Sequence, residues 1–446
     1  MSFRHVGAKR AVAFLFSCLI MIGLNGWGFA YAVVQPSNKD LAGQDTQSVS
    51  AILNQTYSDG VPMTAQPEKS WPQIVSKAAV VMDMTTGTIV YAKNPLQTHY
   101  PASITKIMTA MIALKKGKLT DELSASQNAV SQPSDKLYMV PGETHTLEQL
   151  LYALLLDSAN DAAVEIAEHY GGSVAGFATM MNQEAKNLGA DHTHFENPNG
   201  LPDPSHITTA YDMAVITRAA MQIPEFRKIV QTKMIHWKGK AWQSDLWNLN
   251  RMLFYYPGAI GVKTGYTSIA HETLVVGATH GTQTFLAVLM DTPTDYEIRH
   301  DASSLLDFAF AHYQTETIMP AGVTVGQMKD PKGDQIQLET TEPVLATVRK
   351  SSLPNFTKTL SVQPPVTEEK QGALVGNLVF KQSGMLTGQV PVQINENWQL
   401  PLIQVTSDAS WFIGGGAAAG ILIAGGVIVG WRKVRRRKSE TYDIGV

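Results

Sequence analysis

A 21-residue stretch without a charged residue, 411–431, constrains the fold of this 446-residue chain more than any other part. It is long enough to cross a bilayer as a helix, and Trp411 and Trp431 stand at its two ends, as expected at membrane interfaces. Six basic residues follow between positions 432 and 438. The pattern predicts a single-pass transmembrane helix at 411–431 and a cytoplasmic basic tail at 432–446.

The N-terminal 32 residues have the pattern of a secretory signal peptide. Basic residues precede an apolar core of 14 residues, Ala11–Leu24, and small residues at positions 30 and 32 suit cleavage before Val33. An uncleaved anchor is the alternative. The only cysteine, Cys18, lies inside this segment, so the cleaved chain would have neither a disulfide nor thiol chemistry. Together the two ends predict a cell-membrane protein whose residues from 33 to about 410 lie outside the cell.

The composition describes a globular protein with room for two or three domains, because 44% of the residues are hydrophobic and 16% are charged. The net charge of −3 offers no basic field for nucleic acid, so we expect no such partner. Residues 33–70 are rich in Gln, Ser, Asp and Pro and lack strong periodicity, which predicts a linker.

The segment 71–315 is expected to be a domain of helices and strands. A two-stranded hairpin is predicted at 78–83 and 88–92, and buried strands are predicted at 273–278 and 284–290 after an extended stretch, 261–267. Helices are predicted after Pro101, from Thr144 or Thr146, at 161–170, 174–188, 208–221 and 298–312. Beyond residue 319 short strand-like runs alternate with turns, which predicts a small all-β domain at 319–405.

The first candidate for chemistry is Ser103-x-x-Lys106. Pro101 suits a helix start, so Ser103 falls in a first turn whose free N–H groups favour a developing anion. Lys106 lies three residues later on the same face, where an amine of lowered pKa could accept the proton of the hydroxyl. A helix cap beside a surface lysine is the alternative interpretation of this pair.

Two further candidates follow in the sequence. Ser158-x-Asn160 lies in a short connection between two apolar helices, where both side chains could alternatively cap the second helix. Lys263-Thr264-Gly265 lies in an extended stretch.

The three motifs in this order resemble the low-molecular-mass penicillin-binding proteins, the serine D-alanyl-D-alanine carboxypeptidases. The likeness covers residues 70–315, and the all-β segment resembles that family's C-terminal module. It implies an α/β (α+β) catalytic domain of the penicillin-binding and β-lactamase type, with a central antiparallel sheet and helices. The resemblance rests on four sequence segments: Pro-Ala-Ser-Ile-Thr-Lys, Ser-Ala-Asn-Asp-Ala-Ala, Asn-Pro-Asn-Gly-Leu-Pro and Gly-Val-Lys-Thr-Gly-Tyr-Thr.

The resemblance implies acyl transfer on peptidoglycan stem peptides that end in D-Ala-D-Ala, without a metal or another cofactor. Ser103 would attack the penultimate carbonyl, Lys106 would be the general base, and Ser158 would relay a proton toward the leaving amine. β-Lactams would acylate Ser103 as inhibitors.

The remaining motif residues would bind the substrate. Asn160 would orient the substrate amide and Lys106, Lys263 with Thr264 would take the terminal carboxylate, and Gly265 would let the strand approach the ligand closely. The N–H of Ser103 and one near Tyr266 or Thr267 would form the oxyanion hole.

One position departs from the family, which usually has Ala-Gly where this chain has Ala270-His271-Glu272. The bulky His271 puts the shape of this rim in doubt: it could favour a modified stem peptide, or it could be a tolerated surface change.

Several other functions compete with the carboxypeptidase. A D,D-endopeptidase or a transpeptidase would use the same residues, and an inactive wall-binding scaffold would use none of them. A β-lactamase is disfavoured by the anchor, and other serine hydrolases by the absence of a Gly-x-Ser-x-Gly motif. His192, His194 and Glu196 could ligate zinc, but no His-Glu-x-x-His accompanies them. His206 is expected to be structural.

Overall fold

The computed structural model describes residues 71–329, 335–350, 356–362, 371–382, 385–395 and 440–443. The predicted signal peptide, the linker 33–70 and the segment 411–431 lie outside these residues. Among the helices that are described, none is both long and apolar enough to cross a membrane. The export signal and the membrane anchor therefore remain predictions.

The catalytic part is built around a five-stranded antiparallel sheet with the order β2-β1-β9-β8-β7. The strands are β1 (Ala78–Asp83), β2 (Ile89–Lys93), β7 (Ala259–Thr267), β8 (His271–His280) and β9 (Gln283–Thr292). Strand β1 from the start of the domain pairs with β9 from its end. The predicted hairpin and the three later strands are confirmed, and β7 lies at an edge of the sheet.

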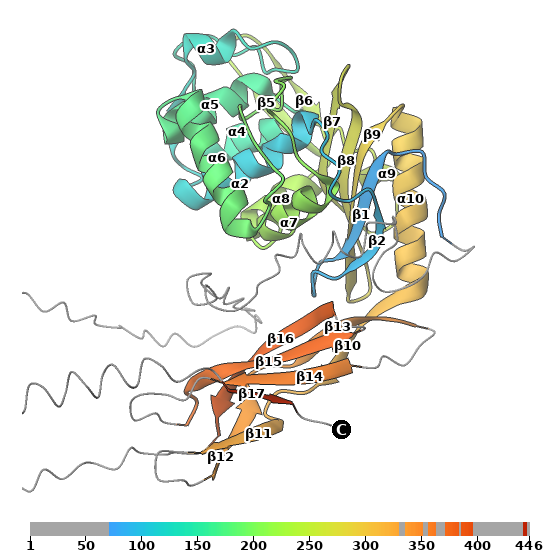
Figure 1. The fold of residues 1–446 in the computed structure, drawn as a ribbon. Helices are drawn as coiled ribbons and strands as arrows, with labels where there is room; N and C mark the ends of the chain where they lie inside the picture. The colour runs from blue at the N-terminus through green and yellow to red at the C-terminus, as the bar shows by residue number, and fades with distance from the viewer. Residues whose placement is uncertain are drawn as a thin grey trace, which may run out of the picture. The chain divides into compact units, whose positions relative to one another are not determined.

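Both faces of this sheet are covered, which explains why β1 is buried along its whole length. Val80 and Met82 pack into the larger core beneath the helical layer, whereas Ala79 and Val81 pack toward α10 (Asp295–His312). This alternation follows from the two-residue period of a strand. Figure 1 shows the helical layer on one side of the sheet and α10 on the other.

The helical layer lies between β2 and β7 in the sequence. It consists of the 3-10 helix η1 (Ala102–Thr105) and of α2 (Lys106–Lys116), α3 (Gln127–Val130), α4 (Leu147–Leu156), α5 (Asn160–Gly171), α6 (Val174–Leu188), α7 (Ala210–Ala220) and α8 (Pro224–Gln231). The sequence assigned most of them correctly. Thr146 caps α4 in a capping box with Gln149, and Gly117 ends α2.

Short elements escaped the sequence analysis. They are the helices α3 and α8, the strand pair β3 (Glu122–Ser124) and β4 (Thr144–Thr146), the hairpin β5 (Met234–Lys238) and β6 (Gln243–Trp247), and the single turn α9 (Met252–Tyr255). The hairpin strands bury one residue in five, so their sequences lack the alternation of a half-buried strand.

The C-terminal part is all-β within the described residues, and its first strand begins at Tyr313, before the predicted start at 319. Strands β10 (Tyr313–Met319) and β13 (Val344–Arg349) form one pair. A six-stranded sheet has the order β11-β12-β16-β15-β14-β17, and its core includes Leu338, Phe380 and Val392. The strands of this sheet are β11 (Thr324–Lys329), β12 (Gln335–Thr340), β14 (Phe356–Val362), β15 (Leu374–Gln382), β16 (Met385–Ile394) and β17 (Glu440–Asp443).

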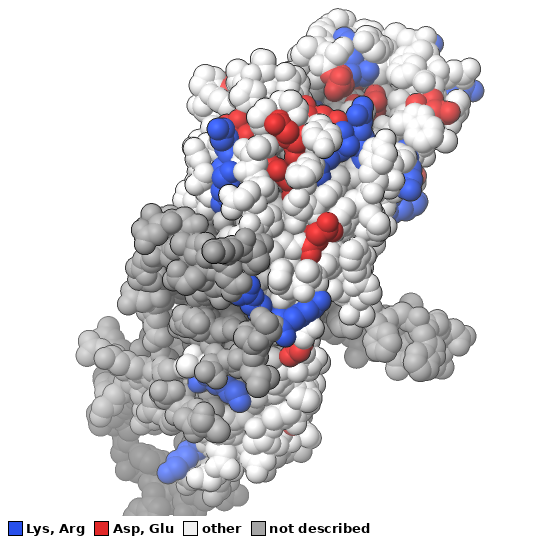
Figure 2. Space-filling model, turned by 90° about the vertical axis from the view of Figure 1, so that its right-hand side faces the viewer, with Lys and Arg blue, Asp and Glu red and all other residues white. Residues whose placement is uncertain are grey.

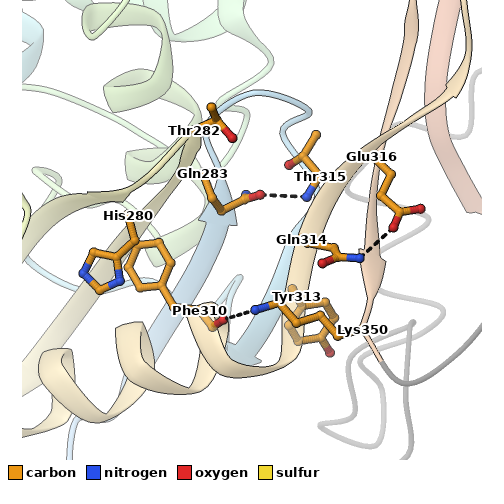
Figure 3. A pocket seen from close by; sticks show the side chains of 9 residues that line it. All are labelled: His280, Thr282, Gln283, Phe310, Tyr313, Gln314, Thr315, Glu316 and Lys350. Atoms are coloured by element: carbon orange, nitrogen blue, oxygen red, sulfur yellow. Dashed lines mark hydrogen bonds between the residues drawn. The ribbon is translucent and has the colours of Figure 1, made fainter.

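Figure 3 shows the point at which α10 passes into β10. A surface pocket of about 400 Å³ lies here, and the ring of His280 stacks on Phe310 with centroids 3.9 Å apart. The backbone N–H of Thr315 donates to Gln283 Oε1 at 2.7 Å. Thr347 Oγ1 of β13 donates to the buried carboxylate of Asp83 at 2.7 Å. Polar contacts therefore continue from the catalytic sheet into the β10–β13 pair.

Strand β17 lies within residues 432–446, which the sequence predicts to be a cytoplasmic tail. It pairs antiparallel with β14, with Glu440 opposite Val362. A chain that crossed a bilayer at 411–431 could not keep this pairing, so the paired β17 and a cytoplasmic tail are alternative arrangements of residues 440–443.

The surface carries mixed charge on the face that Figure 2 shows. Acidic and basic side chains of the described residues are interspersed there, and the net charge is −3.

Candidate active site

Ser103 and Lys106 meet where one kind of helix changes into another. Ser103 lies in η1, and Lys106 is the first residue of α2. Side chains three residues apart eclipse in a 3-10 helix, so this turn brings the two functional groups into line. Their Oγ and Nζ atoms are 2.8 Å apart.

The environment of Lys106 is not that of a surface lysine. Its side chain is completely buried, and Nζ has three acceptors: Ser103 Oγ at 2.8 Å, Asn160 Oδ1 at 2.8 Å and the backbone oxygen of Asn199 at 2.6 Å. Burial lowers the pKa of Lys106 well below its usual value, and the positive charge of Lys263 lowers it further. A neutral amine in contact with a hydroxyl can accept the proton of that hydroxyl.

Asn160 is oriented by the loop that precedes α4. Its side-chain Nδ2 donates to Pro133 O at 3.1 Å, and its backbone N–H donates to Asp135 O at 2.7 Å. With Nδ2 occupied in this way, Oδ1 faces Lys106. The amide is therefore fixed on two sides before any ligand arrives.

Ser158 does not cap the following helix. The N-cap of α5 is Ala159, and no side chain caps that end. Ser158 is buried, has a left-handed backbone with φ of 65°, and its hydroxyl makes no hydrogen bond to any residue that the structure describes. The capping interpretation of this motif is therefore wrong. A non-glycine residue held at positive φ indicates a local constraint of the kind found at functional sites.

Lys263 supplies a buried cation on β7. Nζ donates to Thr264 O at 2.9 Å, and burial lowers the pKa of Lys263 to about 8, opposed by the charges of Asp135 and Asp157. Burial and the charge of Asp135 in turn raise the pKa of Asp157 to about 6. The sequence analysis had missed both carboxylates, because nothing in their sequence positions indicates that they lie near a lysine more than 100 residues away.

Gly265 is required by the contact between β7 and the serine itself. A Cβ at this position would lie 2.5 Å from Ser103 N and 2.7 Å from Thr273 Oγ1. Thr273 donates from Oγ1 to Gly265 O at 3.1 Å and to Pro101 O at 2.9 Å, which fastens the strand to the segment before the serine. The sequence analysis expected Gly265 to allow close approach of a ligand; the close approach in the structure is to the Ser103 backbone.

The loop 197–200 completes the wall around Lys106. Gly200 has φ of 84°, and a side chain there would collide with Ala102 O. Asn199 O is one of the three acceptors of Lys106. The sequence indicated a turn here but not this role, since a backbone acceptor has no signature in the side chains.

His206 contacts the segment that carries Ser103 and Lys106, as expected of a structural residue. Its Nε2 lies 2.9 Å from Thr105 Oγ1, and its Nδ1 accepts the N–H of Glu196 at 3.0 Å. Burial lowers the pKa of His206 to about 4, so the ring is neutral near pH 7.

The possible zinc ligands do not converge. His194 Nε2 contacts Glu196 Oε1 at 2.9 Å on an exposed surface, whereas His192 Nδ1 lies 3.9 Å from the buried Asp212. No group of three or more metal-ligating side chains suited to a metal ion is present within the described ranges.

Comparison with known proteins tests the family that the sequence motifs indicated. The family description "D-alanyl-D-alanine carboxypeptidase", peptidase S11, matches residues 63–294. The chain belongs to this family. It is therefore a hydrolase of the serine D-alanyl-D-alanine carboxypeptidase type and a penicillin-binding protein.

Individual relatives agree with this assignment over much of their length. The chain is 34% identical to D-alanyl-D-alanine carboxypeptidase DacF of Bacillus subtilis over 72% of this chain and 85% of that protein. It is 31% identical to DacD of Escherichia coli over 67% of this chain and 79% of that protein. The solved structure of penicillin binding protein 5 from Haemophilus influenzae is similar with a TM-score of 0.65 and 27% identity, covering 75% of this chain and all of that one.

Proposed function

We propose that this carboxypeptidase removes the terminal D-alanine of peptidoglycan stem peptides through an acyl-enzyme on Ser103. One observation carries the proposal: a completely buried Lys106, whose pKa is well below the usual value, touches the Ser103 hydroxyl at 2.8 Å. This is the arrangement that an activated serine nucleophile needs.

The first half of the reaction forms the acyl-enzyme. Ser103 Oγ attacks the carbonyl carbon of the penultimate D-alanine, and its proton passes to Lys106 Nζ. The carbonyl oxygen becomes an oxyanion, stabilised by the N–H of Ser103 and one from β7 near Tyr266 or Thr267; removal of one such donor typically costs about 3–4 kcal/mol. The proton on Lys106 Nζ then passes through the Ser158 hydroxyl to the leaving nitrogen, the peptide bond breaks, D-alanine departs, and Lys106 is neutral again.

The second half returns the enzyme to its starting state. Water gives a proton to Lys106 and attacks the ester carbonyl; Lys106 then returns this proton to Ser103 Oγ as the ester bond breaks, which releases the shortened peptide and the free Ser103 hydroxyl. A β-lactam enters the same first step, because opening of its ring leaves an ester on Ser103.

Substrate orientation follows from the position of Lys263. The cation, together with Thr264, suits the free carboxylate at the end of a peptide. A substrate with a terminal carboxylate is what a carboxypeptidase cleaves, so this cation supports a carboxypeptidase; the endopeptidase and transpeptidase alternatives would use the same residues. Intact Ser103, Lys106 and Ser158 argue against an inactive scaffold.

The location of the enzyme is a separate proposal that rests on the sequence of its two ends. Residues 1–32 would direct export, 411–431 would anchor the chain in the cell membrane, and the catalytic part would face the cell wall. A reporter placed after residue 446 and protected from external protease in intact cells would support a cytoplasmic tail; cleavage of that reporter from outside would contradict it.

The proposed reaction is tested by product release. The 446-residue chain in detergent is mixed with a stem pentapeptide ending in D-Ala-D-Ala, and free D-alanine is measured. We expect release by the wild type and none by Ser103→Ala. Release by the alanine variant, or none by a folded wild type, would contradict the assignment of Ser103.

A further inference from the structure

Two residues at one end of the central sheet hold a backbone conformation that side chains disfavour. His271, at the start of β8, has φ of 54°, and Asp291, near the end of β9, has φ of 53°. Such residues persist where the surrounding structure holds them, and His and Asp tolerate the conformation better than most residues. The glycine that is usual in the family at position 271 would adopt this φ without strain.

The side chains of these two residues meet each other and a third one. Asp291 Oδ1 lies 2.7 Å from His271 Nδ1, and Asp291 Oδ2 lies 3.4 Å from His99 Nδ1. The side chain of His99 is 9% exposed, and its buried Nε2 has no hydrogen-bond partner among the described residues. One carboxylate therefore bridges two imidazoles, one half-exposed and one buried.

His99 belongs to the segment that delivers the nucleophile, four residues before Ser103. Its backbone is hydrogen-bonded in both directions to Thr208, at 2.8 and 3.0 Å. Two residues later Pro101 O accepts from Thr273 of β8 at 2.9 Å. The segment 99–101 is thus held by Thr208 on the helical side, and by Asp291 and Thr273 on the sheet side.

We propose that Asp291 is a positioning residue for the acylation step: its carboxylate, oriented by His271, holds His99 and thereby fixes the backbone that places Ser103 against β7. The inference rests on the proposed function of Ser103. The inference also assigns a role to His271, which replaces the usual glycine. Its imidazole contacts Asp291 Oδ1 and so orients the carboxylate with Oδ2 toward His99.

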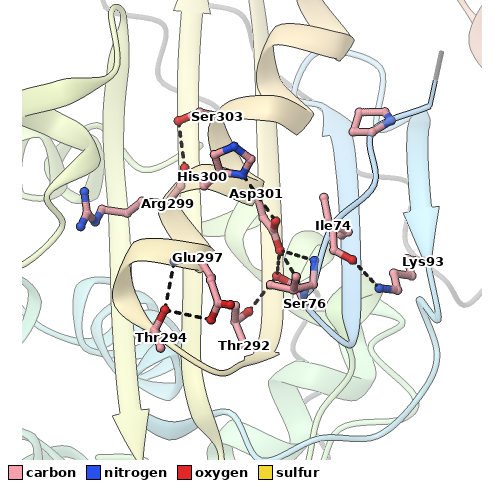
Figure 4. A network of polar contacts seen from close by, with 12 residues as sticks. Ile74, Ser76, Lys93, Thr292, Thr294, Glu297, Arg299, His300, Asp301 and Ser303 are labelled. Carbon is pink, nitrogen blue, oxygen red and sulfur yellow. Dashed lines mark hydrogen bonds and ion pairs between the residues drawn. The ribbon is translucent and has the colours of Figure 1, made fainter.

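The test compares two carboxylates at the same end of the sheet. Asp291→Asn removes the charge and keeps a residue type that tolerates positive φ. The control is Asp301→Asn. Figure 4 shows Asp301 on α10, where it accepts hydrogen bonds from Ser76 N at 2.8 Å and Ser76 Oγ at 2.6 Å without contacting the serine segment.

Acylation by a chromogenic β-lactam is followed by stopped flow with the 446-residue chain. This separates the dissociation constant of the precovalent complex from the acylation rate constant, and the melting temperature is measured alongside. For Asp291→Asn we expect the rate constant to fall roughly tenfold to a hundredfold, while the dissociation constant and the melting temperature stay close to wild type. For Asp301→Asn we expect a lower melting temperature and an unchanged rate constant.

A second variant tests the route through His99. If Asp291 acts through this ring, the double variant His99→Asn, Asp291→Asn acylates no more slowly than the slower of the two single variants, because both remove the same contact. Wild-type acylation by Asp291→Asn, or losses that multiply in the double variant, would overturn the inference. Failure of the wild type itself to acylate would instead overturn the proposed function.

Discussion

Replacement of Gly265 by alanine should disable acylation while leaving most of the fold intact. The added Cβ would lie 2.5 Å from Ser103 N, whereas ordinary van der Waals contact begins at 3.4 Å, so the two segments must separate by 0.9 Å. Ser103 N is a backbone atom and cannot turn aside. The proposed oxyanion donor and the nucleophile Oγ belong to the same residue, so both would be displaced together.

The size of the effect follows from that displacement. A misplacement of about 1 Å costs on the order of a hundredfold in rate, which corresponds to about 2.7 kcal/mol of transition-state stabilisation. Overpacking adds a loss of about 1–3 kcal/mol in the free energy of unfolding. The acylation rate constant with a chromogenic β-lactam should therefore fall about a hundredfold at temperatures well below the melting point.

Gly277→Ala is the matched control for this prediction. It adds the same methyl group to the neighbouring strand β8. There the Cβ would lie 3.0 and 3.3 Å from the flexible side chain of Ile260, which can give way, and 3.8 Å from Phe285 O, an ordinary van der Waals distance. We expect near-wild-type acylation from this control. Acylation by Gly265→Ala at a rate close to that of Gly277→Ala would refute the argument that β7 and Ser103 require a glycine between them.

Three further predictions concern protons. The kcat/KM for a peptide with a free carboxylate should rise with pH as Lys106 loses its proton and fall above about pH 8 as Lys263 becomes neutral. In Lys263→Arg the side chain stays charged, so the fall of kcat/KM at high pH should disappear. An unchanged fall in this variant would contradict the role of Lys263. Asn160→Asp puts a carboxylate in place of the amide oxygen 2.8 Å from Lys106 Nζ, which should raise the pKa of Lys106 and move the acid limb to higher pH; a limb that stays in place would contradict this contact. Because the pKa of His206 is about 4 when folded and 6.5 when exposed, the unfolded chain binds more protons between these values, and stability should fall by up to about 3 kcal/mol as the pH drops from 6.5 to 4. Urea unfolding of His206→Gln at both pH values should lack this part of the loss, and an equal loss in the variant would contradict it.

Much of the fold could be predicted because its signals are local. The residues of β1 form an apolar run beside a turn, and α4 begins with Thr146 and Gln149 in the spacing of a capping box. The hairpin β5–β6 was missed because most of its residues face solvent, so no alternating pattern distinguishes it.

The candidate site was predictable only where side chains carry it. Ser103, Lys106, Asn160 and Lys263 were found by their spacing and by resemblance, and the structure brings the first three within hydrogen-bond distance through Lys106 Nζ. The acceptor that Asn199 provides for Lys106 Nζ is a backbone oxygen, which every residue type has, so the sequence could not indicate it.

The charges around Lys263 and the bridge at Asp291 depend on tertiary contacts. Asp135 faces Lys263 across more than a hundred residues of sequence, and His99 meets Asp291 across almost two hundred. Only His271 gave a local hint, as a departure from the usual glycine. The hint concerned the shape of the rim, and both the positive φ of His271 and the partner of its side chain became evident in the structure.

The most direct test of the account is intact-mass spectrometry of the 446-residue chain after mixing with a penicillin, beside Ser103→Ala. The account predicts a single penicilloyl adduct on the wild type, located by peptide mapping to Ser103, and no adduct on the variant. A folded wild type without an adduct, or an adduct that persists in Ser103→Ala, would contradict the claim that Ser103 is the acylated nucleophile.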